Sequence, residues 1–410
     1  MTEHECLRAL AGEVAQIAHL PIQKETAKLY RAVNSLHPIR PVVLVDELPW
    51  NQLNTAGELT LQCENPFFRE VELDLRKTLY KWKHCAGDLL VMPHYPLSRV
   101  ISEGDMGVQI REDTLSVDQG NSIVSHQYRD QLPDVEALEK LHIPKLLVDD
   151  VQTQNRYQQL EQCFGDLLPI RLTGLRYSGI FAPWDELCMW RGVEPLLLDL
   201  MDEPEKLHAF MRKFTDIRLA LLKQEEELGL LDTYMPTLCA TAGLADDLPA
   251  EPQGRVTRKQ IWGRGAAQIL ASVSPAMHDE FDIAYQQEFF EGFGLVYYGC
   301  CEPLDRKIDI IRKIPNLRKI SISPWADVRV SAEQIGRDYV LSRKPNPASV
   351  AVTQLDDEAI RKDILETLDS CRQNHTTCEF ILKDISTVCH HPEHLTHWSQ
   401  IVKETILQHT

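Results

Sequence analysis

Short apolar runs alternate with amphipathic stretches along most of the chain. A short apolar run bounded by turn residues is typical of a buried strand, whereas apolar residues that recur at helical spacing are typical of a helix. Helical patterns cover, among other segments, Glu194–Leu228 and Pro275–Phe290. The runs that predict strands are Pro41–Val45, Asp88–Met92, Leu168–Thr173, Thr233–Cys239, Gly294–Tyr298, Lys319–Ser323, Tyr339–Ser342 and Phe380–Lys383.

The strand runs alternate with helices, which predicts an α/β fold with a parallel sheet. Eight such strands are the number that closes a (β/α)8 TIM barrel. We therefore expect a single barrel over residues 39–410, preceded by a helical N-terminal extension over residues 1–38. A doubly wound open sheet is the alternative. Two polar stretches are expected to leave this pattern, Ser98–Pro133 as a hairpin and Leu244–Trp262 as an insertion.

Charge narrows the range of partners. The 410 residues include 43 basic and 61 acidic side chains, a formal net charge of −18 at pH 7. This balance disfavours binding to nucleic acid or to an anionic membrane surface, since both depend on Lys and Arg. The sequence has no secretory signal and no apolar run long enough to span a bilayer, so a cytoplasmic protein is expected.

In a reducing cytoplasm, the eleven cysteines are expected to be free thiols, available for metal binding or catalysis. Cys300 and Cys301 follow the strand that ends at Tyr298, where side chains of a barrel face the active site. At least one of the two is expected to ligate a metal. In the first alternative, one cysteine is buried in the core and the other has no function. In the second alternative, the two form a vicinal disulfide. Cys389 follows the last strand and is expected at the same end of the barrel.

Other polar side chains follow the first two strands. Asp46, Glu47 and His94 are expected to project into the same opening, where carboxylate and imidazole groups can act as acid, base or additional ligand. The expected substrate-binding side chains are Trp50, Tyr298, Trp262 and His278. His391, His394 and His397 recur at three-residue spacing, a pattern typical of a metal-binding face but more often of a solvated helix surface.

Several of these segments resemble the uroporphyrinogen decarboxylase superfamily of (β/α)8 barrels, and within it the corrinoid-linked zinc methyltransferases. The resemblance covers most of the chain. Its motifs are an opening strand at Arg40–Val43, a glycine, helix and Asp-x-Pro-Glu element at Gly192–Leu207, the segment Ser274–Phe281, and a cysteine-to-Pro-Glu ending at Cys389–Glu393.

The resemblance implies a zinc ion held by a cysteine after one strand and a cysteine after the last strand. Those positions match Cys300 or Cys301 and Cys389. The histidine of the family's His-x-Cys motif is replaced by Tyr298 or Gly299. The third ligand is therefore left open among the second vicinal cysteine, Glu302, His390 and an acid from the first strand.

The function implied is methyl transfer between a small O-, N- or S-methyl compound, or a thiol, and a corrinoid. Zinc would act as Lewis acid at the heteroatom, and Asp46, Glu47 or His94 would protonate the leaving group. The chain has no Asp-x-His-x-x-Gly sequence, so the corrinoid is expected on a separate protein.

Two other functions are weighed against this one. A decarboxylase of the porphyrinogen type would need converging arginines, with Arg171, Arg176, Arg264 and Arg343 as the candidates, but no arginine pair follows the opening strand. A non-catalytic barrel that only binds a corrinoid protein is the second alternative.

Overall fold

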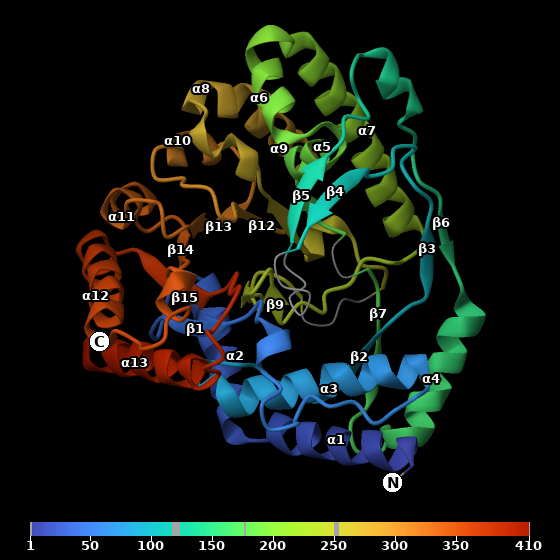
Figure 1. Ribbon diagram of the computed structural model, residues 1–410, viewed down its shortest axis with the longest axis vertical. Coiled ribbons are helices and arrows are strands. Elements are labelled where there is room, and N and C mark those ends of the chain that lie inside the picture. The colour runs from blue at the N-terminus through green and yellow to red at the C-terminus, as the bar shows by residue number, and fades with distance from the viewer. Residues whose placement is uncertain (1, 117–123, 176–177, 250–253, 410) are drawn as a thin grey trace.

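The protein is described from a computed structural model that covers residues 2–116, 124–175, 178–249 and 254–409 (Figure 1). The helices are α1 Glu3–Ala18, α2 Pro21–Asn34, α3 Pro66–His84, α4 Asp150–Phe164, α5 Pro183–Arg191, α6 Val193–Asp202, α7 Pro204–Glu227, α8 Pro275–His278, α9 Ala284–Phe289, α10 Ile308–Ile311, α11 Val328–Ile335, α12 Asp357–Asn374 and α13 Glu393–His409. The strands are β1 Val42–Val45, β2 Tyr95–Ser98, β3 Ile101–Glu103, β4 Glu112–Leu115, β5 Ser125–Tyr128, β6 Leu146–Val148, β7 Ile170–Thr173, β8 Ile180–Phe181, β9 Thr237–Leu238, β10 Thr241–Ala242, β11 Trp262–Gly265, β12 Leu295–Tyr298, β13 Leu317–Ile322, β14 Val340–Arg343 and β15 Thr377–Leu382.

The main sheet is parallel and has seven strands in the order β1-β15-β14-β13-β12-β11-β8. Helices α10 to α13 run along its outer side (Figure 1). Most residues of these strands are buried on both faces of the sheet, as in β1, where all four residues are apolar and buried. Burial on both faces explains why these strands are continuous apolar runs in the sequence. The prediction of an α/β fold with a parallel sheet is confirmed.

Closure of this sheet into a barrel remains a prediction. β1 and β8 are its two edge strands. The segment Asp88–Met92 runs beside β1, because the Asp88 amide donates to Val43 O at 2.6 Å, but it is not assigned as a strand. β2 and β7 form a separate parallel pair. In the sequence, Asp88–Met92, β2 and β7 lie between the edge strands β1 and β8. They are therefore the candidates for completing a barrel.

The strands that the apolar runs predict at β1, β7, β12, β13, β14 and β15 are present with small shifts of their ends. β11 and β8 were not predicted. β11 has the sequence Trp-Gly-Arg-Gly, with two glycines and no β-branched residue, and β8 has only two residues. Both lack the pattern by which a strand is recognised in a sequence.

The N-terminal residues form the helices α1 and α2, and their separation from the rest of the chain as an extension stays a prediction. A capping box begins α1, in which the Thr2 side chain accepts from the Glu5 amide and the Glu5 carboxylate accepts from the Thr2 amide. Pro21 does not break a helix but occupies the first turn of α2, where its missing N–H costs nothing. α1 packs against α3 and α4 through a second apolar core (Figure 1).

The predicted hairpin within Ser98–Pro133 is confirmed as the antiparallel pair β4–β5, although residues 117–123 lie outside the described part. The insertion Leu244–Trp262 ends where β11 begins, and residues 250–253 are likewise outside the described part. Within the described ranges, none of the helices is both long and apolar enough to cross a membrane.

Candidate functional site

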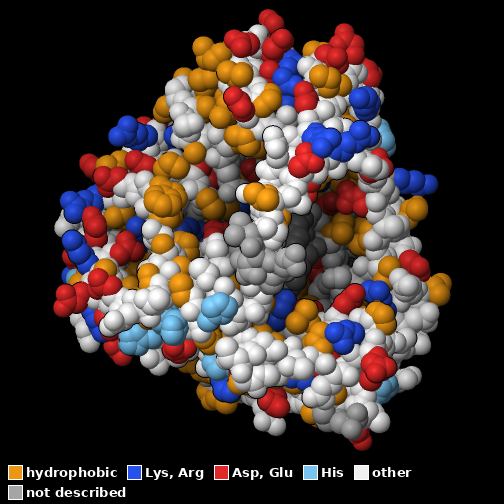
Figure 2. Space-filling view, viewed as in Figure 1, with side chains coloured by type: hydrophobic (Ala, Val, Ile, Leu, Met, Phe, Trp, Pro, Cys, Tyr) orange, Lys and Arg blue, Asp and Glu red, His pale blue; other side chains and the backbone are white. Residues whose placement is uncertain are grey.

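A cavity of about 790 Å³ lies at the carboxyl ends of β1, β12 and β15, and the face in Figure 2 is hollowed near its centre. Parallel strands bring their carboxyl ends to one edge, so residues that are distant in the sequence meet there. Of the residues predicted for the site, the cavity lining includes Asp46, Glu47, Trp50, His94, Cys300 and Cys301.

The two vicinal cysteines leave the end of β12 in a tight turn. Gly299 has a φ of +97°, and a Cβ there would come within 2.6 Å of Leu304 Cδ1, so only glycine fits. The buried Glu302 carboxylate accepts from the Cys300 amide at 2.9 Å and fixes the turn from inside. The Sγ atoms of Cys300 and Cys301 are consequently 3.6 Å apart, and both side chains line the cavity.

Cys300 is prepared for ionisation by its neighbours. The hydrogen bond from Cys301 lowers the pKa of Cys300 to about 7; burial opposes this, and the charges of Lys383 and Arg264 add to it. Lys383 Nζ lies 3.8 Å from Cys300 Sγ. The same hydrogen bond raises the pKa of Cys301, so the pair has one thiolate and one thiol near neutral pH.

A pair of carboxyl groups stands next to these thiols. Lys383 Nζ is 3.0 Å from Glu47 Oε2 and 3.1 Å from Asp384 Oδ2, and Cys301 Sγ is 3.3 Å from Asp384 Oδ2. Burial and the hydrogen bond with Asp384 raise the pKa of Glu47. Burial also disfavours the Asp384 anion, but the hydrogen bond from Glu47 and the Lys383 charge outweigh it and lower that pKa. Glu47 is therefore the proton-carrying member of the pair.

The backbone at both carboxyl groups is left-handed, with a φ of +51° at Glu47 and +57° at Asp384. Residues other than glycine rarely adopt this conformation, and it costs about 1 kcal/mol or more. It turns both side chains toward the cavity directly after β1 and β15.

Asp46 and His94 also line the cavity. Asp46 Oδ1 accepts from Lys81 Nζ at 2.8 Å, so its charge is already balanced. His94 Nε2 is buried without a hydrogen-bond partner among the described residues, and burial together with the Arg171 charge lowers its pKa. His94 is thus a neutral imidazole with an unused ring nitrogen. Trp50 lies under the Lys77 ammonium, 5.1 Å from Nζ to the ring centroid.

The remaining predicted substrate-binding residues are buried, and none of them is among the described residues that line this cavity. Tyr298 donates to Asp282 Oδ2 at 2.6 Å, and His278 Nε2 is 2.7 Å from the same hydroxyl. The indole of Trp262 donates to Gly243 O at 2.7 Å. These three side chains are engaged in the interior next to the site.

The side chains around Cys300 fit zinc in the kind of donor they offer. Cys300, Cys301 and Asp384 form a continuous chain of contacts, and thiolate and carboxylate are zinc ligands. Cys389 is not one of the described cavity-lining residues; its amide donates to Thr387 Oγ1 at 3.0 Å, in a left-handed turn beside Gln52. The Glu302 carboxylate is occupied by backbone amides of Cys300 and Ala267.

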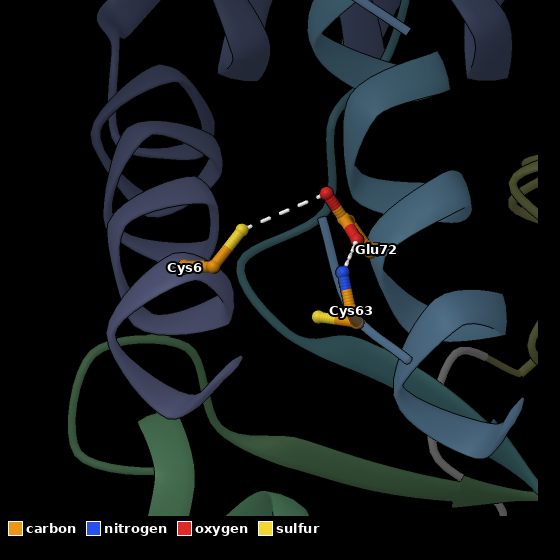
Figure 3. A group of neighbouring side chains, drawn as sticks. All are labelled: Cys6, Cys63 and Glu72. Atoms are coloured by element: carbon orange, nitrogen blue, oxygen red, sulfur yellow. Dashed lines mark hydrogen bonds between the residues drawn. The ribbon is translucent and has the colours of Figure 1, made fainter. Parts of the chain in front are cut away.

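Among the described residues, two groups bring three possible ligand atoms within 4.8 Å of one another, and neither group contains Cys300, Cys301 or Asp384. One is Cys6, Cys63 and Glu72, buried between α1 and α3 (Figure 3). Its carboxylate already accepts from the Cys63 amide at 2.8 Å and from Arg76 Nε at 2.7 Å, which makes it a structural cluster. The other is His391, Glu393 and His394 at the start of α13, of which His394 is buried. Histidines gather on the face shown in Figure 2. His397 is paired with Asp357.

Lys383 and Asp384 were not predicted as site residues, whereas Arg264 was named among the candidate arginines of a decarboxylase. Lys383 and Asp384 directly follow the last strand, and that position was the signal that could have identified them. Arg264 lies in β11, a strand that the hydrophobic pattern of the sequence did not predict. Of the arginines considered for a decarboxylase, Arg171 pairs with Asp232 and Arg343 with Asp363, while Arg176 lies outside the described residues.

No protein-family model matches the chain, and no curated protein matches its sequence. Among solved structures, the fold resembles a methyltransferase from Methanosarcina mazei with a TM-score of 0.43 and 12% sequence identity. The matched region covers 91% of this chain and 97% of that one. A likeness at this level carries no functional conclusion, and membership of the uroporphyrinogen decarboxylase superfamily stays a prediction.

Proposed function

We propose that the protein is a methyltransferase that moves a methyl group between a small methylated compound, or a thiol, and a corrinoid carried by a separate protein. The observation that carries the proposal is the convergence of Cys300, Cys301, Glu47 and Asp384 around Lys383 in one cavity. Methyl transfer needs a stabilised heteroatom and a proton donor, and this arrangement offers candidates for both.

Cys300, Cys301 and Asp384 are the residues that would hold zinc in this proposal, in place of the ligand that the sequence assigned to Cys389. When bound, zinc supplies Lewis acidity at the heteroatom of the substrate. Lys383 balances the negative charge that the thiolate and carboxylate ligands bring into a half-buried place.

Glu47 is the proposed proton donor. Its pKa is raised by burial and by the hydrogen bond with Asp384, so Glu47 keeps its proton to a higher pH than an exposed glutamate does. It faces the cavity beside the thiols. Asp46 and His94 line the same cavity, but the Asp46 carboxylate is paired with Lys81 and a neutral His94 is suited to accept a proton instead.

The scaffold proposed for this activity is a (β/α)8 barrel whose seven-stranded sheet is completed by the segments between β1 and β8. The corrinoid protein would approach the carboxyl ends of the strands, where the cavity lies. The cavity volume of about 790 Å³ exceeds what a small methylated compound needs, and it leaves space for a second reactant.

A porphyrinogen decarboxylase is less well supported. Such a substrate carries several carboxylates and needs several arginines around it. Of the described arginines that the sequence offered, Arg264 lines the cavity, whereas Arg171 and Arg343 are paired elsewhere.

Metal analysis of four single variants tests the zinc assignment. We expect Cys300→Ser and Cys301→Ser to lose bound zinc, and Cys389→Ser to keep it. Cys188→Ser, a partly buried thiol in α5 outside the cavity, is the matched control. Loss of zinc in Cys389→Ser with retention in Cys301→Ser would restore the ligand set of the sequence prediction and refute the one proposed here.

A further inference from the structure

Arg264 lines the cavity and, unlike Lys81 and Lys383, has no carboxylate partner among the described residues. Its side chain lines the cavity from the third position of β11, and its Nε is buried without a hydrogen-bond partner among the described residues. The structure records no ion pair between this guanidinium and any described carboxylate. By contrast, Lys383 is paired with Glu47 and Asp384.

An unpaired guanidinium in a half-buried place is costly, since its lost hydration is not replaced. The nearby Glu302 carboxylate does not replace it, because its oxygens accept from the amides of Cys300 and Ala267. A bound ligand that carries an anionic group would offset this desolvation cost. The planar donors of arginine match a carboxylate in a two-point contact.

The wall beside Arg264 is apolar. It is formed by Ile180 of β8 and by the hairpin β9–β10, with Met235, Leu238 and Ala240 among the cavity-lining residues. Cys239 and Ala240 make the turn of this hairpin with left-handed φ values of +44° and +66°. Cys239 and Arg264 both line the cavity. A ligand held by Arg264 would therefore place an apolar body against this wall.

We propose that Arg264 binds the carboxylate of the substrate, and that the substrate is a small carboxylic acid with an apolar body. The inference rests on the proposed function only in assigning this ligand to methyl transfer; the binding itself needs neither zinc nor corrinoid. Arg264, Cys300 and Cys301 line the same cavity, so the bound acid would share this cavity with the thiols.

Calorimetric titration with benzoate, and with the uncharged benzamide of the same shape, tests this site on the full-length protein. We expect wild type to bind benzoate and to bind benzamide at least about tenfold more weakly, as a charge-assisted contact requires. Arg264→Gln should bind benzoate about tenfold or more weakly, and Arg264→Lys should retain part of the affinity. Arg129→Gln is the matched control, because Arg129 pairs with Asp113 on the exposed β4–β5 hairpin.

Equal binding of the two compounds, absence of benzoate binding by wild type, or unchanged affinity in Arg264→Gln would overturn the inference. Thermal melting of each variant shows whether it is folded, and Arg264→Lys keeps the test decisive if the glutamine variant is not. Failure of methyl transfer with intact benzoate binding would refute the proposed function and leave the carboxylate site standing.

Discussion

The ammonium group of Lys383 lies 3.8 Å from the thiol of Cys300, although the two residues follow different strands and are 83 positions apart. The lysine also contacts Glu47 and Asp384 and is nearly buried. A cation held in this place stabilises negative charge on both the sulfur and the carboxylates. It links the thiol pair and the acid pair into one site.

The first prediction concerns the ionisation of Cys300 in the metal-free protein. Since its pKa is lowered to about 7, alkylation of Cys300 by iodoacetamide should rise with pH around a midpoint near 7. Lys383→Met removes the neighbouring cation and should move that midpoint upward by about one unit or more. Mass spectrometry of the labelled peptide measures it. A midpoint in Lys383→Met equal to that of wild type would contradict the role of the lysine.

The second prediction concerns Glu47 as proton donor. Glu47→Gln keeps the size of the side chain but removes the proton-carrying carboxyl group, and should lower kcat about a hundredfold. The raised pKa of Glu47 also predicts that the rate falls as the pH rises and the carboxyl ionises. This alkaline decline should be absent in Glu47→Gln. Glu25→Gln, on the exposed α2 beside Lys28, should leave the rate and the pH profile unchanged.

The sequence allowed prediction of the strands that are buried on both faces, because their apolar runs are continuous. It also allowed placement of Glu47 and Cys300 at the same sheet edge, since both follow such runs. It did not allow prediction of β11, whose sequence is Trp-Gly-Arg-Gly, and so it did not show that Arg264 lies in a strand of the main sheet. Nor did position after a strand suffice for Cys389, because the chain between Lys383 and Cys389 turns away before the cysteine is reached.

The third prediction concerns the buried cluster around Glu72, shown in Figure 3. Glu72→Gln should lower the free energy of unfolding by about 3–5 kcal/mol, because Arg76 is left without its anionic partner. Glu70→Gln, on the exposed side of the same helix, should change it by about 0.5 kcal/mol or less. Denaturant unfolding measures both.

The pH dependence of this cluster has a definite sign. Backbone amides of Cys63 and Gln62 together with Arg76 overcome the effect of burial and lower the pKa of Glu72 from 4.5 to about 2. A carboxyl with a lowered pKa in the folded state stabilises the fold above its unfolded pKa, and this stability is lost as the pH falls toward 2. The difference between wild type and Glu72→Gln should therefore shrink below pH 4.5. A difference that grows on acidification would refute this assignment.

The fourth prediction concerns the charge pair inside the sheet. Lys319 of β13 and Glu379 of β15 are fully buried, and Nζ lies 2.8 Å from Oε1. Lys319→Met should cost about 3–5 kcal/mol, because it leaves the buried Glu379 anion without its ammonium partner. The double variant Lys319→Met with Glu379→Leu should be more stable than Lys319→Met alone. A double variant with additive losses would show that the two charges do not depend on each other.

The central claim is that the cavity at Cys300 transfers methyl groups. The most direct measurement is methylation of free cob(I)alamin by the purified zinc-loaded protein, followed by absorbance with a panel of small methylated carboxylic acids. We predict transfer from at least one of them, loss of transfer in Cys300→Ser, and normal transfer in Cys188→Ser. Transfer that persists in Cys300→Ser would contradict the account, as would a wild-type protein that transfers no methyl group from any O-, N- or S-methyl donor.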